Sequence, residues 1–306
     1  MSANSRNAAR TPDVSICIAN HRTPELTLAC LGSITRYSEG LDVEVLLVNN
    51  TADDCEALAA AVGALPQAQF VQNERPLSFA ANQNLLMRRA HGRYFMALNS
   101  DTLLTPGALA ELLAFAGARP RCGMVGPKLV HPDGGLQPSC RNFPAPWTHF
   151  LEASGLWQLL RNRRAVGRRY AICSPHDEAM AVDWLTGACL LVRAEVFVQT
   201  GGYDELRFGG MYGEDIDWCR RIHAGGWQIW FDPAAVIVHA ESASPLDGRT
   251  VQMYRGFYRY CALHLTRGRQ RAMRAATWLA LGPRWLLARD PHKRSVYRQI
   301  MQLPVE

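Results

Sequence analysis

The sequence predicts an α/β fold, with a mostly parallel sheet covered by helices on both faces. Residues 14–20 (VSICIAN) and 43–50 (VEVLLVNN) are apolar, β-branched runs that are typical of buried strands. Between them, Pro24 opens a segment with helical periodicity that extends to about Tyr37. Strands that alternate with helices through such short links favour parallel pairing, with helices on both faces of the sheet.

The alternation continues through residue 118, and after an irregular stretch it resumes. We expect an excursion from the core at about 140–181, where prolines, tryptophans and arginines replace the regular pattern. The other elements that we predict are helix 53–64, strand 69–73, helix 79–91, strand 93–99, helix 106–118, a strand running into a helix over 187–197, a helix from Glu214, and strand 235–240. We divide the chain into a flexible N-terminus (1–12), an α/β domain (13–245) and a basic, helical C-terminal region (246–306).

The composition narrows the class of protein. The 306 residues are 48% hydrophobic and 20% charged, as in a folded globular protein. The nine cysteines form no CxxC pair, which argues against a zinc site, and their odd number fits a reducing compartment. The first thirteen residues have no apolar core of a secretory signal, and no apolar run reaches the length of a spanning helix. We therefore expect a cytoplasmic location.

The net charge of +6 is unevenly placed. Residues 249–306 contain twelve Lys and Arg against two acids, a net +10, so residues 1–248 carry −4. A second basic cluster contains Arg161, Arg163, Arg164, Arg168 and Arg169. These charges indicate either a solvated helical surface or contact with an anionic membrane or a phosphate-bearing acceptor. We expect no nucleic-acid partner, because no recognition module is present.

Polar residues follow the predicted strands at Asn20, Asn49-Asn50 and Asn99-Ser100-Asp101. Ligands of open α/β sheets bind at the carboxyl ends of the strands, so these side chains are candidates for a binding site. Asp101 and the amide oxygen of Asn99 are suitable ligands for a hard divalent cation, although a simple Asn-Ser-Asp turn is the alternative. His239 ends strand 235–240 and is either structural or a further metal ligand.

Asp215 is the candidate general base. In a helix that begins at Glu214, steps of 100° place Asp215 with Trp218 and Ile222 on the apolar face, and Glu214, Asp217 and Arg221 on the polar side. An ionised carboxylate is costly to bury without a partner, so such a group is usually paired or functional. The alternative is a cap at the helix N-terminus.

Two further groups have open interpretations. Asn73, Asn82 and Asn84 lie around Arg75 and either hold a base or phosphates or cap helix 79–91. Tyr254, Phe257, Tyr258 and Cys261 recur at helical spacing and form either core packing or a membrane face.

Eight segments in order resemble the family-2 glycosyltransferases, in particular a bacterial rhamnosyltransferase-type branch. They are VSICIANHR, LLVNN, NERPLSFAANQN, YFMALNSD, VDWLTGACLLVRAEVF, GGYDE, MYGEDIDWCRR and GW…FDPAAVIVHAES, and they cover about residues 13–245. The resemblance implies a GT-A fold and inversion at the anomeric carbon.

The resemblance also implies roles for single residues. Asn99 and Asp101 match the DxD-type motif, and with His239 they would hold a magnesium or manganese ion. Asp215 matches the base. Residues on the acceptor side are Trp184, Gly187, Ala188 and Glu214. Nucleotide-sugar binding would involve Asn20, Asn49, Asn50, Arg75, Asn82, Asn99 and Asp101.

Three departures from the family pattern concern the donor. Asn49 replaces an aspartate that usually reads the nucleobase, Asn99 replaces the first acid of DxD, and Ser78 replaces a glycine, while FGGMYGED is one residue longer than usual. The predicted donor is dTDP-rhamnose, and the predicted acceptor is a hydroxyl of a cell-surface polysaccharide or lipid-linked glycan, with peripheral contact to an anionic membrane.

The alternatives are a UDP-hexose-dependent enzyme of the same fold, a nucleotidyltransferase, and a non-catalytic sugar-nucleotide-binding protein. The segment ANHRTPE, which has no glycine after the first strand, argues against a nucleotidyltransferase.

Overall fold

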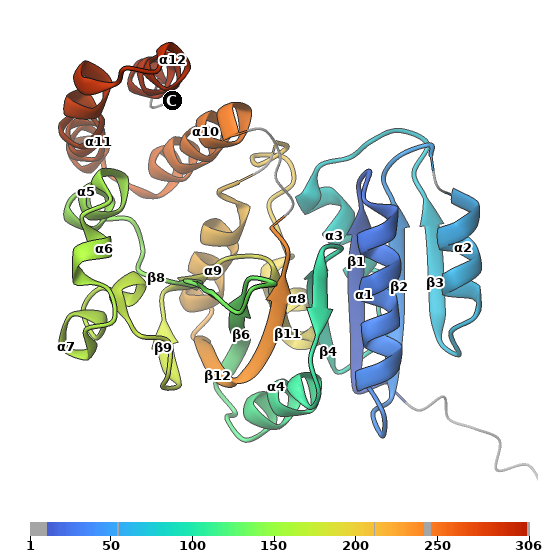
Figure 1. Cartoon of the computed structure of the whole chain (residues 1–306). Coiled ribbons are helices and arrows are strands. Elements are labelled where there is room, and N and C mark those ends of the chain that lie inside the picture. Colours follow the sequence, from blue (N-terminus) through green and yellow to red (C-terminus); the bar gives the residue numbers. More distant parts are fainter. Residues whose placement is uncertain (1–10, 54, 211, 242–245, 305–306) are drawn as a thin grey trace, which may run out of the picture.

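The computed structural model describes residues 11–53, 55–210, 212–241 and 246–304. Its centre is a ten-stranded sheet in the order β3-β2-β1-β4-β11-β6-β12-β5, with β7 paired to β6 and β9 paired to β12 (Figure 1). The strands are β1 (Val14–Asn20), β2 (Val43–Asn49), β3 (Ala68–Gln72), β4 (Tyr94–Asn99), β5 (Thr102–Leu104), β6 (Cys122–Val130), β7 (Leu136–Gln137), β9 (Met180–Val182), β11 (Cys189–Arg193) and β12 (Gln228–His239).

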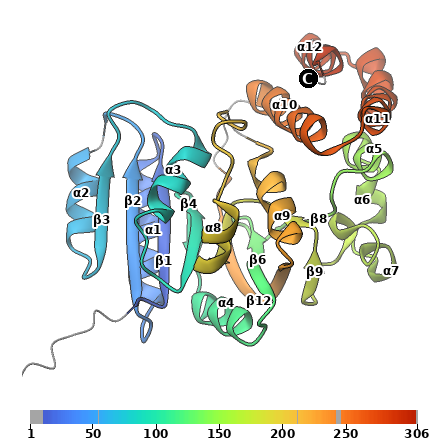
Figure 2. The same ribbon diagram turned by 180° about the vertical axis from the view of Figure 1, so that it is seen from behind.

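Helices cover both faces of the sheet, which confirms the predicted fold class (Figures 1 and 2). One face packs against α1 (Pro24–Tyr37), α2 (Cys55–Gly63) and α4 (Ala108–Gly117), and the other against α3 (Phe79–Met87), α8 (Ala194–Thr200) and α9 (Glu214–Ala224). Strand β1 shows why: Ile16 and Ile18 point into the first hydrophobic layer, and Cys17 between them points into the second.

The strand directions are parallel in the first half and mixed in the second. β1, β2, β3 and β4 pair in parallel, whereas β11 is antiparallel to both of its neighbours, β4 and β6. Strand β6 was not predicted, because Gly123, Gly126 and Pro127 interrupt its apolar pattern. A Cβ at Gly126 would lie 2.8 Å from Leu185 Cδ1, so the glycine lets the Leu185 side chain pack directly on the backbone of β6.

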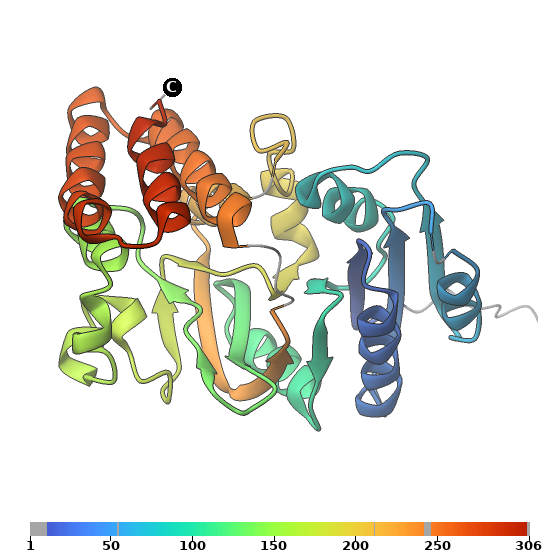
Figure 3. The ribbon, with the colours of Figure 1, turned by 45° about the horizontal axis from the view of Figure 1, so that its top comes forward.

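The excursion forms α5 (Pro146–Ser154), α6 (Trp157–Leu160), α7 (Arg164–Gly167) and the 3₁₀ turn Ala171–Cys173, and its two ends pair as β8 (Cys140–Arg141) and β10 (Trp184–Leu185). The C-terminal region forms α10 (Leu246–His264), α11 (Arg267–Leu287) and α12 (Pro291–Gln302). We call α5–α7 and α10–α12 the helical cap; it lies at the end of the molecule opposite β3 (Figure 3).

Contacts between α5 and α11 join the two parts of the helical cap. His149 Nε2 lies 2.7 Å from Thr277 Oγ1, and the Arg284 guanidinium donates to the carbonyls of Ala153 and Ser154 at the end of α5. Tyr258 and Cys261 on α10 are buried, and Tyr254 and Phe257 pack beside them. The aromatic stripe is therefore core packing, and a membrane face at these four positions is wrong.

Candidate functional site

A cavity of about 590 Å³ lies between the second half of the sheet and the helical cap. Its walls come from the end of β4, the segment before β11, the start of α9, the end of β12, and helices α5 and α10. Of the residues predicted from the sequence, the cavity brings together Asn99, Trp184, Gly187, Ala188, Glu214, Asp215 and His239.

Asp215 is held by a backbone contact from the segment before β11. The Gly187 N–H donates to Asp215 Oδ2 at 3.1 Å, while the buried Oδ1 has no hydrogen-bond partner in the part of the chain that the structure describes. Burial raises the pKa of the carboxyl well above its usual range, because desolvation disfavours the charged form. An unpaired oxygen with a raised pKa is suited to accept a proton.

Glu214 adds a second buried carboxyl to the cavity wall. It is 4% exposed, and its Oε2 also lacks a partner among the described residues. Burial and the neighbouring Asp215 raise the pKa of Glu214 above its usual range. Two adjacent buried carboxyls do not both ionise readily, so near neutral pH we expect the pair to retain a proton.

Gly187 must be a glycine for Asp215 to hold this position. A Cβ at residue 187 would lie 2.6 Å from Asp215 Oδ1, so a methyl group must displace the carboxylate. We expect Gly187→Ala to lower kcat by about 10²-fold, the effect of misplacing a catalytic group by about 1 Å. Steady-state kinetics together with a thermal melt would check this; unchanged kcat in a folded variant would contradict it. Gly32→Ala is the matched control, because the added methyl group would meet open space. Gly201→Ala is unsuitable as a control, because the backbone of Gly201 has φ 76°.

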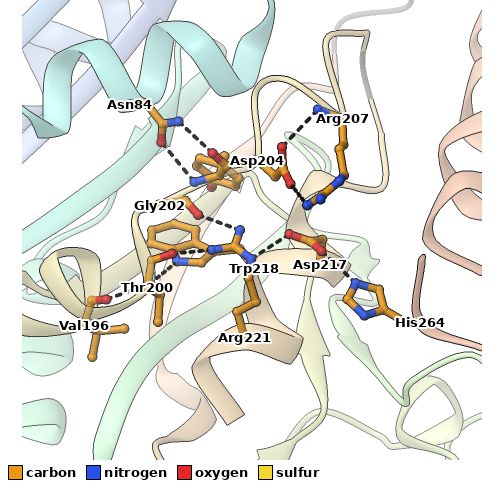
Figure 4. Close-up of polar contacts among 11 residues, drawn as sticks. Asn84, Val196, Thr200, Gly202, Asp204, Arg207, Asp217, Trp218, Arg221 and His264 are labelled. Atoms are coloured by element: carbon orange, nitrogen blue, oxygen red, sulfur yellow. Dashed lines mark hydrogen bonds and ion pairs between the residues drawn. The ribbon is translucent and has the colours of Figure 1, made fainter. Parts of the chain in front are cut away.

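The polar side of α9 is buried, contrary to the prediction from the helical wheel. Asp217 is 3% exposed; its Oδ2 accepts from Arg221 Nε at 2.8 Å and its Oδ1 from His264 Nε2 at 2.7 Å (Figure 4). The reason is that α10, which carries His264, covers this side of α9. A Cβ at Gly213 would lie 2.7 Å from the carbonyl oxygen of Gly256, so the two backbones touch where α9 begins.

Further contacts fix α9 to the loop after α8. Arg221 donates to the carbonyls of Thr200 and Gly202, and Trp218 Nε1 donates to Thr200 Oγ1 at 2.8 Å (Figure 4). Asn84 on α3 exchanges hydrogen bonds with the backbone of Tyr203 in the same loop. These contacts hold the first turn of α9, and with it Asp215, against the sheet.

Breaking the Asp217 contacts should cost stability. We expect Asp217→Ala to lower the free energy of unfolding by about 3 kcal/mol, because it removes one partner of a buried ion pair. Denaturant titration measures this. Asp177→Ala removes an exposed acid that pairs with Arg164 and should change the midpoint little. Equal midpoint shifts in the two variants would show that the buried network does not stabilise α9.

Of the residues predicted to hold a metal, Asn99 and His239 line the cavity, and Asp101 lies beside them without lining it. Asp101 Oδ1 lies 3.3 Å and Asn99 Nδ2 3.4 Å from His239 Nε2. His239 Nδ1 lies 2.8 Å from Gln137 Oε1, and Gln137 Nε2 donates back to the His239 carbonyl. Because an amide oxygen only accepts, Nδ1 of His239 donates to Gln137, and Nε2 is the ring nitrogen that is directed toward Asp101 and Asn99.

This donor set fits a divalent cation that the protein holds only in part. The described residues contain no cluster of three or more His, Cys, Asp or Glu suited to a metal. Asp101 and His239 would supply a carboxylate and an imidazole, a combination that suits ions such as Mn²⁺, and the remaining positions would need oxygen ligands from a bound molecule or water. Gln137, which orients His239, was missed because nothing in its sequence context marks it.

The asparagines at the ends of the first strands lie away from this cavity. Asn20 Nδ2 donates to Asn49 Oδ1 at 2.8 Å, and Asn49 Nδ2 donates to the carbonyls of Thr51 and Asp53. Asn50 exchanges hydrogen bonds with the backbone of Leu77. These amides therefore stabilise the loops, and their donor-binding role stays a prediction.

Asn82 and Arg75 complete the predicted donor side. Asn82 Oδ1 accepts from Asn73 Nδ2 at 2.8 Å, within the same loop network. Arg75 is exposed. The cap of α3 comes from Ser78, whose hydroxyl accepts from Ala81 N, so Asn73 and Asn82 are not the caps considered from the sequence.

Sequence comparison decides the family. The family described as "Glycosyltransferase like family 2" matches residues 12–259. The chain belongs to this family. The predicted resemblance to the family-2 glycosyltransferases is thereby confirmed.

Individual relatives agree with this assignment. An N-acetylglucosaminyl-diphospho-decaprenol L-rhamnosyltransferase of Mycobacterium tuberculosis is 35% identical over 156 residues, which are 49% of this chain and 48% of the relative. The O-antigen biosynthesis protein RfbC of Myxococcus xanthus is 30% identical over 240 residues, 76% of this chain and 18% of the relative. The match therefore spans about half the length of the first relative and a smaller share of the second.

A solved structure confirms the GT-A fold. The mannosyltransferase PcManGT from Pyrobaculum calidifontis, determined in complex with GDP-Man and Mn²⁺, superposes with a TM-score of 0.60 at 16% identity, covering 96% of this chain and 84% of that one. None of the helices in the described ranges is long and apolar enough to cross a membrane.

Proposed function

We propose that this family-2 member is an inverting rhamnosyltransferase that uses dTDP-rhamnose and a lipid-linked glycan acceptor. The observation that carries the proposal is the unpaired Oδ1 of Asp215, buried in the wall of the same cavity that contains Asn99 and His239. In-line displacement requires a base that activates the acceptor hydroxyl and a separate site that binds the leaving diphosphate.

The reaction balances with Asp215 as proton acceptor. The acceptor hydroxyl oxygen attacks the anomeric carbon and forms the new glycosidic bond, while the bond from that carbon to the diphosphate breaks. Asp215 takes the hydroxyl proton, and the nucleoside diphosphate leaves with the bonding electrons. Because the acceptor oxygen attacks the anomeric carbon from the face opposite the diphosphate, the configuration at that carbon is inverted.

The donor diphosphate would lie at Asn99, Asp101 and His239. A magnesium or manganese ion bound there would neutralise negative charge on the leaving diphosphate. Asn99, a neutral residue, leaves Asp101 as the acid of this motif, which is why His239 and its support from Gln137 matter for the site. Donor residues on the nucleoside side would be Asn20, Asn49, Asn50 and Asn82, acting through the loops that they stabilise, together with the exposed Arg75.

The cavity also supports a phosphate-bearing, lipid-linked acceptor. Beyond Asp215 it is lined by Trp184, Tyr254 and Phe257, whose rings suit the apolar faces of a sugar, and by the guanidinium groups of Arg141 and Arg249. The Mycobacterium tuberculosis relative is named for a sugar-diphospho-decaprenol acceptor. We place the enzyme in the cytoplasm, at the inner face of the cell membrane, acting in cell-envelope polysaccharide synthesis.

Two other functions make different predictions. A UDP-hexose-dependent enzyme of the same fold would share the base and the metal site, and Asn49 in place of the usual aspartate leaves this alternative for experiment. A non-catalytic sugar-nucleotide-binding protein would have no need for a carboxylate with a buried, unpaired oxygen in the cavity wall, and Asp215 therefore argues against it.

The experiment is a thermal-shift screen of nucleotide sugars with and without Mn²⁺, followed by turnover with an N-acetylglucosaminyl-diphospho-prenol. We expect dTDP-rhamnose with Mn²⁺ to raise the melting temperature most and to be consumed. A larger rise in melting temperature with a UDP-hexose, together with its turnover, would overturn the assignment of dTDP-rhamnose as the donor. Stabilisation by a nucleotide sugar, without transfer to any acceptor, would favour the binding protein.

A further inference from the structure

Seven large apolar side chains on or beside α5, α6 and α11 of the helical cap are exposed. We call them the outer face; they are Trp147, Leu156 and Leu159 from α5 and the start of α6, and Trp278, Leu279, Leu286 and Leu287 from α11. Leu159 and Leu287 are 71% and 81% exposed. In all three views α5, α6 and α11 lie along the end of the molecule farthest from β3 (Figures 1, 2 and 3).

Helix α11 has two apolar sides. Met273, Thr277 and Leu281 are buried against the rest of the protein. Trp278, Leu279 and Leu286 project from a different side and are exposed. Single exposed leucines are ordinary on protein surfaces, whereas several on one set of packed helices mark a surface that meets a partner.

Positive charge near the outer face indicates which kind of partner it binds. Exposed cations lie on α11, directly after α6, α7 and α11, and on α12, which packs against α11. They are Arg267, Arg269 and Arg271 on α11, Arg161, Arg163, Arg168, Arg169 and Arg289 in the segments after the helices, and Lys293, Arg294 and Arg298 on α12. A second copy of the chain docked symmetrically would place like charges against each other. An anionic bilayer instead attracts the guanidinium groups and accepts tryptophan and leucine at the headgroup boundary.

Helix α5 connects the outer face to the active site. His149 and Glu152 on this helix line the cavity, whereas Trp147 on the same helix is 55% exposed and stacks on Phe150. A helix with its side chains is about 10 Å across. A bilayer at the outer face would therefore lie about one helix away from the cavity, close enough to present the head of a lipid-linked acceptor.

We propose that the outer face binds an anionic phospholipid bilayer, so that the protein is a peripheral membrane protein through α5, α6 and α11. The choice of a lipid-linked acceptor rests on the proposed function, but bilayer binding itself requires no catalysis. The surface differs from the aromatic stripe of α10, which packs inside the helical cap.

Flotation of the full-length protein with vesicles tests this. We expect binding at low salt to phosphatidylcholine vesicles that contain phosphatidylglycerol, and much weaker binding to phosphatidylcholine alone. The combined variant Leu279→Gln, Leu286→Gln and Leu287→Gln should lose about tenfold or more in partitioning, because each leucine contributes buried apolar area. Leu206→Gln, which changes a leucine that is 93% exposed outside the helical cap, is the matched control and should float like the wild type.

The outcomes separate this inference from the proposed function. The triple variant should keep its melting temperature and its turnover of a water-soluble, short-chain acceptor, while losing turnover of a vesicle-embedded one. A wild type that fails to float, or a triple variant that floats equally well, overturns the bilayer surface. A variant that dissociates from dimer to monomer while still floating assigns the outer face to a second copy instead. Flotation of a protein that transfers no sugar would overturn only the proposed function.

Discussion

Asp215→Asn is expected to lower kcat by about 10³-fold, within the range for loss of a positioned general base. The asparagine keeps the size of the side chain and an oxygen that can accept from the Gly187 N–H, but it cannot take a proton at neutral pH. The variant should fold at least as stably as the wild type, because it removes one of two adjacent buried carboxyls. Steady-state turnover and nucleotide binding by calorimetry, measured side by side, check both statements.

The nucleotide affinity is the control for this variant. Asp215 is the proposed base for the acceptor and not a proposed ligand of the diphosphate, so the dissociation constant for dTDP with Mn²⁺ should stay within about twofold of the wild type. Glu214→Gln, at the neighbouring carboxyl, should reduce kcat far less than Asp215→Asn. Turnover of Asp215→Asn within tenfold of the wild type would show that another group accepts the proton.

Asp101→Ala should produce the second largest loss, about 10²-fold or more in kcat/KM, because it removes the one carboxylate of the proposed metal site. The dissociation constant for Mn²⁺, read by electron paramagnetic resonance in the presence of dTDP, should rise in parallel. Gln137→Ala should weaken Mn²⁺ binding by about 10-fold to 100-fold, the usual effect of removing the partner that orients a ligating histidine.

Asp133→Ala is the control for metal binding, because Asp133 is an exposed acid in the turn between β6 and β7. It should leave both the Mn²⁺ affinity and kcat/KM unchanged. If Asp101→Ala binds Mn²⁺ as tightly as this control does, the ion is held elsewhere, and Asp101 and His239 form an ordinary structural pair.

The fold could be predicted wherever the residue pattern is local. The apolar, β-branched runs of β1 and β2 and the proline at the start of α1 determine those elements within one or two residues. Strand β6 was not predicted, because its glycines are required by neighbours that are far away in the sequence, as the contact between Leu185 and Gly126 shows. The antiparallel direction of β11 follows from the path of the excursion before it, which periodicity does not reveal.

The site residues also divide into those whose surroundings are local in sequence and those whose partners are distant in sequence. The apolar helix face around Trp218 predicted burial of Asp215. In the structure Asp215 is half-buried with its Oδ1 enclosed, whereas Glu214 and Asp217, which were predicted on the polar side, are more buried. The burial of Asp217 could not be predicted, because its partner His264 lies 47 residues away on α10. The cavity wall that contains Tyr254 and Phe257 comes from the helical cap, and Arg141 beside it comes from β8, where the sequence showed only a basic tail and an irregular stretch.

The pH dependence of kcat/KM tests the proposed buried base most directly. A base whose folded pKa is raised is protonated and inactive at low pH, and it becomes active as the pH rises through that raised pKa. We therefore expect wild-type kcat/KM to increase across the range from about pH 5 to 8, above the usual titration of an aspartate at about 4. In Asp215→Asn this increase should disappear along with most of the rate. A wild-type profile that is flat over the same range, with the rate lost only near the ordinary aspartate pKa, would contradict the assignment of Asp215 as a desolvated general base.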